Sequence, residues 1–267
     1  MILYPNAKIN LGLNVVSKRT DGYHNIQTVF VPVALCDQLQ IERADTTTFN
    51  PTGIGVDCEP MQNLIMKTVS LFRRQFNIGD VKIDFCKRIP FGAGLGGGSS
   101  DAAHTALALN RLFNLNLTNK ELKNIVSSLG ADCAFFIENS TCYAEGIGDI
   151  LTPINLSLDN YNIVLVKPQV EVSTKEAYQG IKVSQPKVHV LDAIKEDIHR
   201  WKTTIRNDFE DSVFPQHKEI AAVKNKLYEL GAVYASMTGS GACVYGIFKD
   251  KINNIEQLFP DCFCWAE

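Results

Sequence analysis

The order of apolar and polar residues predicts a strand-rich N-terminal segment. Residues 9–15 alternate between Ile, Leu or Val and Asn or Gly, the two-residue period of a half-buried strand. Residues 20–22 (Thr-Asp-Gly) have the composition of a turn, and residues 26–33 fit a returning strand. Residues 39–42 fit a shorter strand. We therefore expect two long strands joined by a turn, followed by a third.

A helical period replaces this alternation from residue 63. Apolar residues between 64 and 72 share one stripe, which predicts an amphipathic helix. Residues 81–87 return to the two-residue period of a strand. Residues 101–110 follow a glycine-rich stretch and are rich in Ala and Leu, so a second helix is expected there.

A third helix is expected from Thr118, because Glu121 is placed to complete a capping box with it. Gly130 is its expected stop. Beyond residue 160 the pattern changes to mixed strands and helices. Strands are predicted at 162–166, 234–237 and 243–248, helices at 191–205 and 219–230, and a loop at 182–187.

Composition and charge narrow the class of protein. The 267 residues are 45% hydrophobic and 21% charged, as in ordinary globular proteins, and fit one large or two modest domains. The formal net charge is -3 without a long Lys/Arg run, so nucleic acid is not an expected partner. No apolar stretch approaches the roughly 20 residues of a membrane span, and residues 1–8 do not resemble a signal peptide. We expect a cytoplasmic protein without a membrane partner.

The eight cysteines do not form a recognisable metal or disulfide framework. Structural zinc sites usually show close ligand pairs, and this chain has no C-x-x-C. In a cytoplasmic chain cysteines are most often buried, reduced thiols. They stand at Cys36, Cys58, Cys86, Cys133, Cys142, Cys243, Cys262 and Cys264.

The stretch between the strand at 81–87 and the helix at 101–110 predicts a phosphate-binding loop. Five glycines lie between Gly92 and Gly98. Glycine permits positive φ and lets backbone N–H groups approach an anion closely. The N-terminus of the following helix would add unpaired N–H groups and a favourable dipole.

Three other glycine-rich motifs lack residues that they require. Gly92, Gly94 and Gly97 match the dinucleotide pattern G-x-G-x-x-G, but no acidic residue follows about twenty positions on. A Walker A loop needs a lysine, and none lies between Gly92 and Ser100. The G-x-S-x-G spacing of a hydrolase is absent. A flexible surface loop that caps the helix is the structural alternative, and phosphate binding is favoured over it.

Three segments resemble the sequence motifs of the GHMP kinases. Pro90–Ala103 resembles the second motif, P-x-G-x-G-L-G-x-S-x-A, with one extra glycine that one branch of the family shares. Pro5–Leu11 resembles the first motif, and Met237–Cys243 resembles the third, a C-terminal glycine loop that closes on the nucleotide site. The resemblance covers nearly the whole chain and is weakest at 180–210.

The resemblance implies an α+β fold with the two-domain GHMP kinase architecture. Residues 1–157 would form the N-terminal ATP-binding domain, similar to ribosomal protein S5 domain 2. Residues 158–267 would form a ferredoxin-like C-terminal domain. ATP is the implied co-substrate and Mg²⁺ the implied cofactor.

Three further segments resemble one branch of this family, whose alcohol substrate is a cytidylylated methylerythritol. They are Asp21–His24, Leu129–Asp132 and Ala144–Gly148. This resemblance implies transfer of the γ-phosphoryl group of ATP to the 2-hydroxyl of that substrate, in non-mevalonate isoprenoid synthesis. The expected partner is thus a small molecule carrying cytidine diphosphate, bound by a monomer or weak homodimer.

By this resemblance, Asp132 would be the catalytic base and Lys8 would lie beside it. A carboxylate can accept the proton of the substrate hydroxyl, and an ammonium can offset charge that develops on the phosphoryl group. Asn10 lies on the same strand face as Lys8 and would bind the substrate polyol. Cys133-Ala134 stand where family members often have Val-Pro, so we expect a less constrained backbone beyond Asp132.

The remaining implied site residues divide between nucleoside and nucleotide. Tyr23 would stack on cytosine and His24 would hydrogen-bond its edge, while Phe30 would line the pocket and Tyr178 would stack on the opposite face. Ser100 is a candidate magnesium ligand. The residues expected to bind ATP are Pro90, Phe91, Gly92, Ala93, Gly94, Leu95, Gly96, Gly97, Gly98, Ser99, Ser100, Thr238, Gly239, Ser240 and Gly241.

Two alternative functions have features that separate them from this one. Another GHMP kinase would act on homoserine, mevalonate or a sugar, none of which carries the nucleobase that Tyr23 and His24 would bind. A non-catalytic nucleotide-binding module would not need both Lys8 and Asp132.

Overall fold

The computed structural model describes residues 1–55 and 60–267, which form two compact units. Unit 1 comprises Met1–Ala7, Val33–Phe91 and Gly96–Ser140. Unit 2 comprises Lys8–Pro32, Gly92–Leu95 and Thr141–Glu267. The units interleave along the sequence, and the expected boundary after residue 157 stays a prediction. Of the eight cysteines, Cys58 lies outside the described residues. Within the described residues, no helix is long and apolar enough to cross a membrane.

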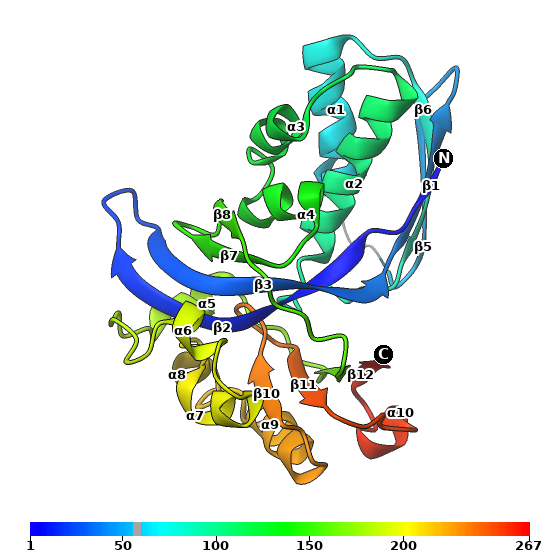
Figure 1. Cartoon of the computed structure of the whole chain (residues 1–267). Coiled ribbons are helices and arrows are strands. Elements are labelled where there is room, and N and C mark those ends of the chain that lie inside the picture. The colour runs from blue at the N-terminus through cyan, green and yellow to red at the C-terminus, as the bar shows by residue number, and fades with distance from the viewer. Residues whose placement is uncertain (56–59) are drawn as a thin grey trace. The chain divides into compact units, whose positions relative to one another are not determined.

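Unit 1 is a four-stranded sheet with helices on one face (Figure 1). The strand order is β1-β4-β6-β5, in which β5 runs parallel to β6 and the other pairs are antiparallel. Helices α1 and α2 pack against each other, and α2 also contacts β4. The strands are β1 Ile2–Leu3, β4 Gln38–Arg43, β5 Thr48–Gly53 and β6 Val81–Lys87. The helices are η1 Pro60–Gln62, α1 Leu64–Phe76, α2 Gly97–Leu112, α3 Asn119–Val126, η2 Ala131–Ala134 and α4 Phe135–Glu138.

The local sequence explains where the helices of unit 1 begin. Asn63 caps α1, because its side chain accepts the N–H of Ile65 at 2.9 Å. The predicted capping box of Thr118 and Glu121 is confirmed at the start of α3. Helix α2 begins earlier than expected, inside the glycine-rich loop, so the loop and the helix form one structure.

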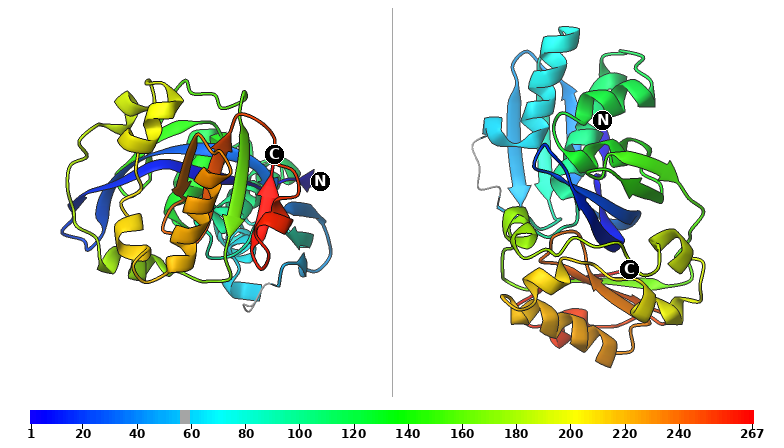
Figure 2. Two further views of the ribbon diagram at one scale, coloured as in Figure 1. Left: turned by 90° about the horizontal axis from the view of Figure 1, so that it is seen from below. Right: turned by 90° about the vertical axis from the view of Figure 1, so that its left-hand side faces the viewer.

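Two further four-stranded sheets have the strand orders β2-β3-β7-β8 and β10-β11-β9-β12; they belong to unit 2 apart from residues 6–7 of β2 and 33–36 of β3. Helix α9 (orange in Figure 2) packs on the second of these sheets, against β10 and β11. The strands are β2 Asn6–Lys18, β3 His24–Cys36, β7 Cys142–Glu145, β8 Ile150–Pro153, β9 Asn162–Lys167, β10 Tyr234–Met237, β11 Val244–Phe248 and β12 Phe263–Ala266. The helices are α5 Thr174–Gln179, α6 Val190–Ala193, η3 Ile198–Arg200, α7 Trp201–Thr204, α8 Glu210–Val213, α9 Lys218–Glu229 and α10 Ile255–Leu258.

Strand β2 is more buried than its alternating sequence predicts. The polar residues Asn10 and Asn14 are 2% and 5% exposed, although a half-buried strand would leave them in water. Both side chains have buried polar partners, because the Asn10 Nδ2 donates to the Thr28 hydroxyl at 3.1 Å and the Asn14 Nδ2 donates to the Asp208 carboxylate at 3.3 Å. The alternating polar residues of β2 therefore face further buried polar groups and not water.

The helix predicted at 191–205 is wrong as a single element. Three short helices, α6, η3 and α7, occupy this stretch. His189 caps the first, and the Asp197 carboxylate caps the second by accepting the His199 N–H at 2.9 Å. An Asp that satisfies a new helix start interrupts the preceding one, because it competes for the same backbone groups.

Candidate functional site

The first half of the predicted phosphate loop belongs to unit 2, where it pairs with the C-terminal glycine loop. The carbonyls of Gly92 and Ala93 accept the N–H groups of Ala242 and Cys243 at 3.0 and 3.2 Å. The Leu95 carbonyl accepts the backbone N–H of Lys8 at 2.9 Å. Segments from the three motifs thus meet through main-chain hydrogen bonds.

Glycine is required where these two loops touch. Gly94 has φ of +71°, and a Cβ there would overlap the carbonyl oxygen of Thr238. Gly239 has φ of +55°, and a Cβ there would lie 3.1 Å from the carbonyl oxygen of Gly94. The positive φ disfavours a side chain at both positions, and at Gly94 the lack of space excludes one as well.

The second half of the loop opens helix α2 in unit 1. Gly96 is the N-cap residue with φ of +71°, and its carbonyl accepts the Ser100 N–H at 2.9 Å. The next N–H groups belong to the first helical turn, which has no intrahelical acceptors for them. Gly97, Gly98 and Ser99 are partly exposed, so this turn is a suitable anion site.

A buried ionic cluster lies beneath that turn. The Lys87 ammonium contacts Asp37 and donates to Asp101 at 2.9 Å, and all three side chains are 6% exposed or less. A Cβ at Gly97 would lie 3.0 Å from the Lys87 Nζ. Burial raises the pKa of Asp101 to about 8, against the opposing pull of Lys87. The cluster fixes the floor of the turn, and sequence reasoning missed it because Lys87 is 50 residues from Asp37 and 14 residues from Asp101 along the chain.

Lys8 and Asn10 form a buried polar pair in unit 2. Lys8 is 3% exposed, and its Nζ donates to the Asn10 Oδ1 at 2.5 Å. The same ammonium lies 5.0 Å from the ring centroid of Phe30, which is itself 1% exposed. The Asn10 Nδ2 donates to Thr28 at 3.1 Å. Protein groups therefore engage both ends of the Asn10 amide, which orients Lys8; its role toward the substrate polyol stays a prediction.

Asp132 lies in the first turn of η2 in unit 1 and is partly exposed. The neighbouring Cys133 is buried, and its Sγ and the Ser99 Oγ would lie 3.3 and 3.5 Å from a Cβ at Gly130. Burial raises the pKa of the Cys133 thiol to about 11. The expected base is therefore on a short helical turn whose next side chain packs beside the phosphate loop.

Two of the aromatic residues implied in base recognition, Tyr23 and His24, lie at the turn between β2 and β3, whereas Tyr178 lies in α5. Tyr23 is 62% exposed. The His24 ring stacks on Tyr178 with centroids 4.7 Å apart, and Tyr178 meets Phe209 edge-on at 4.8 Å. Burial, and to a smaller extent the charge of Lys18, lower the pKa of His24, which favours its neutral form. In this state Tyr178 backs His24, and its stacking on cytosine stays a prediction.

Other predicted residues differ in their exposure. Phe91 is 45% exposed, whereas Thr238 and Ser100 are fully buried. The Ser100 Oγ lies 3.3 Å from the His104 Nδ1, so this hydroxyl already has a protein partner. Ser240 is partly exposed and lies 3.4 Å from the Thr174 hydroxyl.

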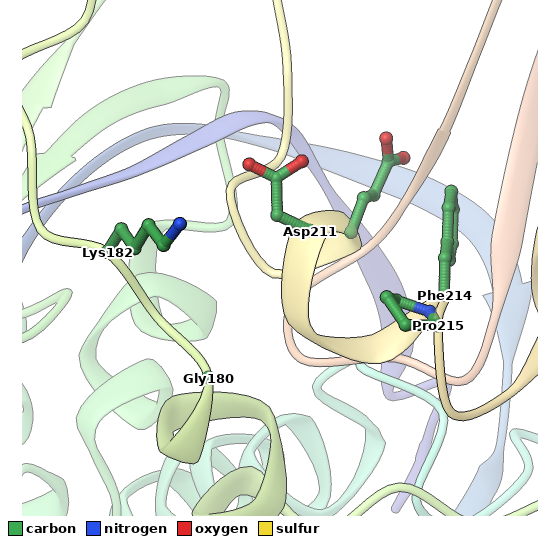
Figure 3. A pocket seen from close by; sticks show the side chains of 6 residues that line it. Gly180, Lys182, Asp211, Phe214 and Pro215 are labelled. Atoms are coloured by element: carbon green, nitrogen blue, oxygen red, sulfur yellow. The ribbon is translucent and has the colours of Figure 1, made fainter.

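A pocket elsewhere in unit 2 contains none of the predicted site residues. Figure 3 shows Lys182 extending toward Asp211 across its mouth. The Asp211 carboxylate is paired with Arg206, and the Glu210 carboxylate binds Lys224 at 2.5 Å. Both acids are therefore committed to protein cations. The pocket is lined by Gly180, Lys182, Glu210, Asp211, Phe214 and Pro215.

Family models identify the class of protein that has these loops. The model of the GHMP kinases N terminal domain matches residues 63–140, and that of the GHMP kinases C terminal domain matches residues 190–258. The chain belongs to the GHMP kinases, and its α+β architecture is the one expected. It is thus an ATP-dependent small-molecule kinase.

Relatives define the branch of the family more narrowly. The chain is 48% identical over 266 residues to the 4-diphosphocytidyl-2-C-methyl-D-erythritol kinase of Parabacteroides distasonis, covering 99% of this chain and 98% of that protein. It is 49% identical over 255 residues to the kinase of the same name from Bacteroides thetaiotaomicron, covering 94% and 93%. The crystal structure of a 4-(cytidine 5'-diphospho)-2C-methyl-D-erythritol kinase matches with a TM-score of 0.86 and 31% identity, over 100% of this chain and 98% of that one.

Proposed function

We propose that this chain transfers the γ-phosphoryl group of ATP to the 2-hydroxyl of 4-diphosphocytidyl-2-C-methyl-D-erythritol, in isoprenoid biosynthesis. One observation supports the kinase activity most directly. The two glycine loops meet backbone to backbone at Gly94 and Gly239, and the first loop is hydrogen-bonded to the strand that contains Lys8. The relatives that match nearly end to end support the choice of substrate. A cytoplasmic, monomeric or weakly dimeric protein is part of the same proposal.

The chemistry follows from the two charged side chains. The substrate oxygen forms a bond to the γ-phosphorus while the bond from that phosphorus to the β–γ bridging oxygen breaks, and ADP leaves. The Asp132 carboxylate accepts the hydroxyl proton. The Lys8 ammonium, fixed by Asn10, offsets negative charge on the phosphoryl oxygens.

The residues near the phosphate loop fit a magnesium ion held mostly by nucleotide. Among residues 1–55 and 60–267 no group of three or more His, Cys, Asp or Glu side chains is arranged to hold a metal. Mg²⁺ keeps several waters and uses one or two carboxylates plus substrate phosphates, so a sparse protein donor set suits it. When bound, the ion supplies positive charge at the phosphates. Ser99 is a partly exposed residue of the first turn of α2, whereas the buried Ser100 would have to turn its hydroxyl away from His104 to bind the ion.

Replacing Tyr23 with Ala is expected to raise the KM for the cytidylylated substrate with little change in the KM for ATP. Stacking on a base contributes about 1–3 kcal/mol, which corresponds to a rise in KM of roughly 5- to 150-fold. Tyr23 is exposed and supports no core, so the fold should be unaffected. Steady-state kinetics with each substrate varied in turn measures both constants. The control is Tyr4→Ala, which removes another exposed tyrosine; equal effects of the two changes would exclude stacking by Tyr23.

A panel of alcohols tests the proposed function directly. ADP release is measured with ATP and Mg²⁺ and, in turn, 4-diphosphocytidyl-2-C-methyl-D-erythritol, homoserine, mevalonate and galactose. We expect turnover of the cytidylylated alcohol alone. Turnover of another alcohol instead would reassign the substrate within the family, and no turnover of any would favour a binding module.

A further inference from the structure

We propose that Asn207 is a positioning residue of the phosphotransfer site, acting as an amide clamp on the C-terminal glycine loop. This inference rests on the proposed function. Asn207 lies in the 180–210 stretch, where the sequence resemblance is weakest, and none of the three motifs includes it. It acts through Thr238 and Asn10 on Lys8.

The Asn207 side chain is buried, and both amide hydrogens and the amide oxygen have backbone partners. It is 1% exposed. Its Nδ2 donates to the carbonyl of Met237 at 2.7 Å and to that of Gly239 at 2.8 Å. Its Oδ1 accepts the N–H of Phe209 at 3.0 Å. One amide therefore holds together the two carbonyls that flank Thr238 in the sequence.

Main-chain bonds hold Asn207 against strand β2. The N–H of Leu13 donates to the Arg206 carbonyl at 2.9 Å, and the N–H of Asp208 donates to the Leu13 carbonyl at 2.8 Å. The Asp208 carboxylate also accepts the Val15 N–H at 2.8 Å. Asn207 is thus held beside β2, the strand that contains Lys8, and the contacts at Leu13 and Val15 lie five and seven residues beyond Lys8 on that strand.

A short series of polar contacts leads from the clamp to Lys8. The Thr238 hydroxyl accepts the backbone N–H of Asn10 at 3.0 Å and lies 3.4 Å from the Asn10 Oδ1. That same Oδ1 accepts the Lys8 ammonium at 2.5 Å. Because Thr238 stands between the two clamped carbonyls, its position depends on Asn207. A shift of the loop would therefore move a partner of the group that orients Lys8.

Asn110 offers a matched structural control. Its amide also binds backbone at both ends, accepting the Leu117 N–H and donating to the Leu117 carbonyl, each at 3.0 Å. It lies near the C-terminal end of α2 in unit 1, away from the glycine loops along the chain. Loss of this amide removes the same kind of contact from a loop without a catalytic role. If Asn207 acted only through stability, replacing either asparagine should have a similar effect on kcat.

The test compares Asn207→Asp, Asn207→Ala and Asn110→Ala at a temperature where each is fully folded. We expect both Asn207 changes to lower kcat about 10- to 100-fold, since small misplacements of reacting groups have effects of that size. The KM for the cytidylylated substrate should stay near the wild-type value. Asn110→Ala should keep kcat within about twofold of wild type, whatever its melting temperature.

The pH dependence of Asn207→Asp supplies a readout that loss of stability would not reproduce. A protonated carboxyl can donate one hydrogen bond to the clamped carbonyls, whereas an ionised one can donate none. The kcat of Asn207→Asp relative to wild type should therefore rise as the pH falls, while the ratio for Asn207→Ala stays flat. Wild-type kcat in both folded Asn207 variants, or flat ratios for both, would overturn the clamp.

The same variants separate this inference from the proposed function. If the wild-type chain phosphorylates a different alcohol from the panel, the substrate assignment fails, and kcat with that alcohol tests the clamp instead. If it phosphorylates none, ATP titration by calorimetry tests whether the loop still depends on Asn207. Unchanged ATP affinity in Asn207→Asp would then count against the clamp, and a weakened affinity would support it.

Discussion

Asp132→Asn is expected to lose most turnover while ATP binding is retained. Asparagine matches aspartate in size but cannot accept the proton of the substrate hydroxyl. General-base catalysis typically contributes about 10²- to 10⁴-fold, so kcat should fall by that factor. The ADP-release assay gives kcat, and calorimetric titration gives the ATP affinity, which should stay within about twofold because the phosphate loop itself is unchanged.

Glu138→Gln is the matched control for this change. Glu138 is a carboxylate in the helix that follows η2, and it pairs with Lys123 at 2.7 Å near the surface. Its neutralisation should leave kcat unchanged, since surface ion pairs contribute little. Wild-type rates for Asp132→Asn would remove Asp132 from the mechanism. Equal losses in the two variants would point to a general effect of charge.

Much of the fold was predictable because local patterns agree with the final packing. The strand at 81–87 and the capping box at Thr118 are set by neighbours in the sequence, and both are found as expected. The stretch 191–205 was not predictable in the same way. There the caps at His189 and Asp197 outweigh the apolar period, so the chain forms several short helices.

The candidate site divides along similar lines. The glycines of the site could be recognised in the sequence, because positions such as Gly94 and Gly239 need positive φ and close backbone approach. The polar residues that support these loops could not be recognised in the same way. Asn207 and Lys87 are ordinary polar residues in the sequence, and only tertiary contacts reveal what they hold. A resemblance to motifs also cannot show that the Asn10 amide is already engaged by Lys8 and Thr28.

Lys8→Met is expected to lower kcat about 100- to 1,000-fold with little loss of stability. Methionine is an unbranched side chain of similar volume, but it has no positive charge to offset the negative charge on the phosphoryl oxygens. Removing one preorganised electrostatic contact commonly has an effect of this size. Asn10 keeps its bond to Thr28 in this variant, so the surrounding strand should hold its position. The measurements are kcat from ADP release and the melting temperature.

Lys87→Met is the control that separates an effect on chemistry from an effect on stability, because Lys87 is a buried lysine like Lys8. Lys87 lies between Asp37 and Asp101, so its loss leaves two buried carboxyl groups without their cation. Breaking such a cluster typically costs about 3–5 kcal/mol of stability. Lys87→Met should therefore show a large fall in melting temperature, whereas Lys8→Met should show a large fall in kcat. If Lys8→Met instead lost stability and kept its kcat when folded, Lys8 would be a structural lysine, and the transferring phosphoryl group would require another cation.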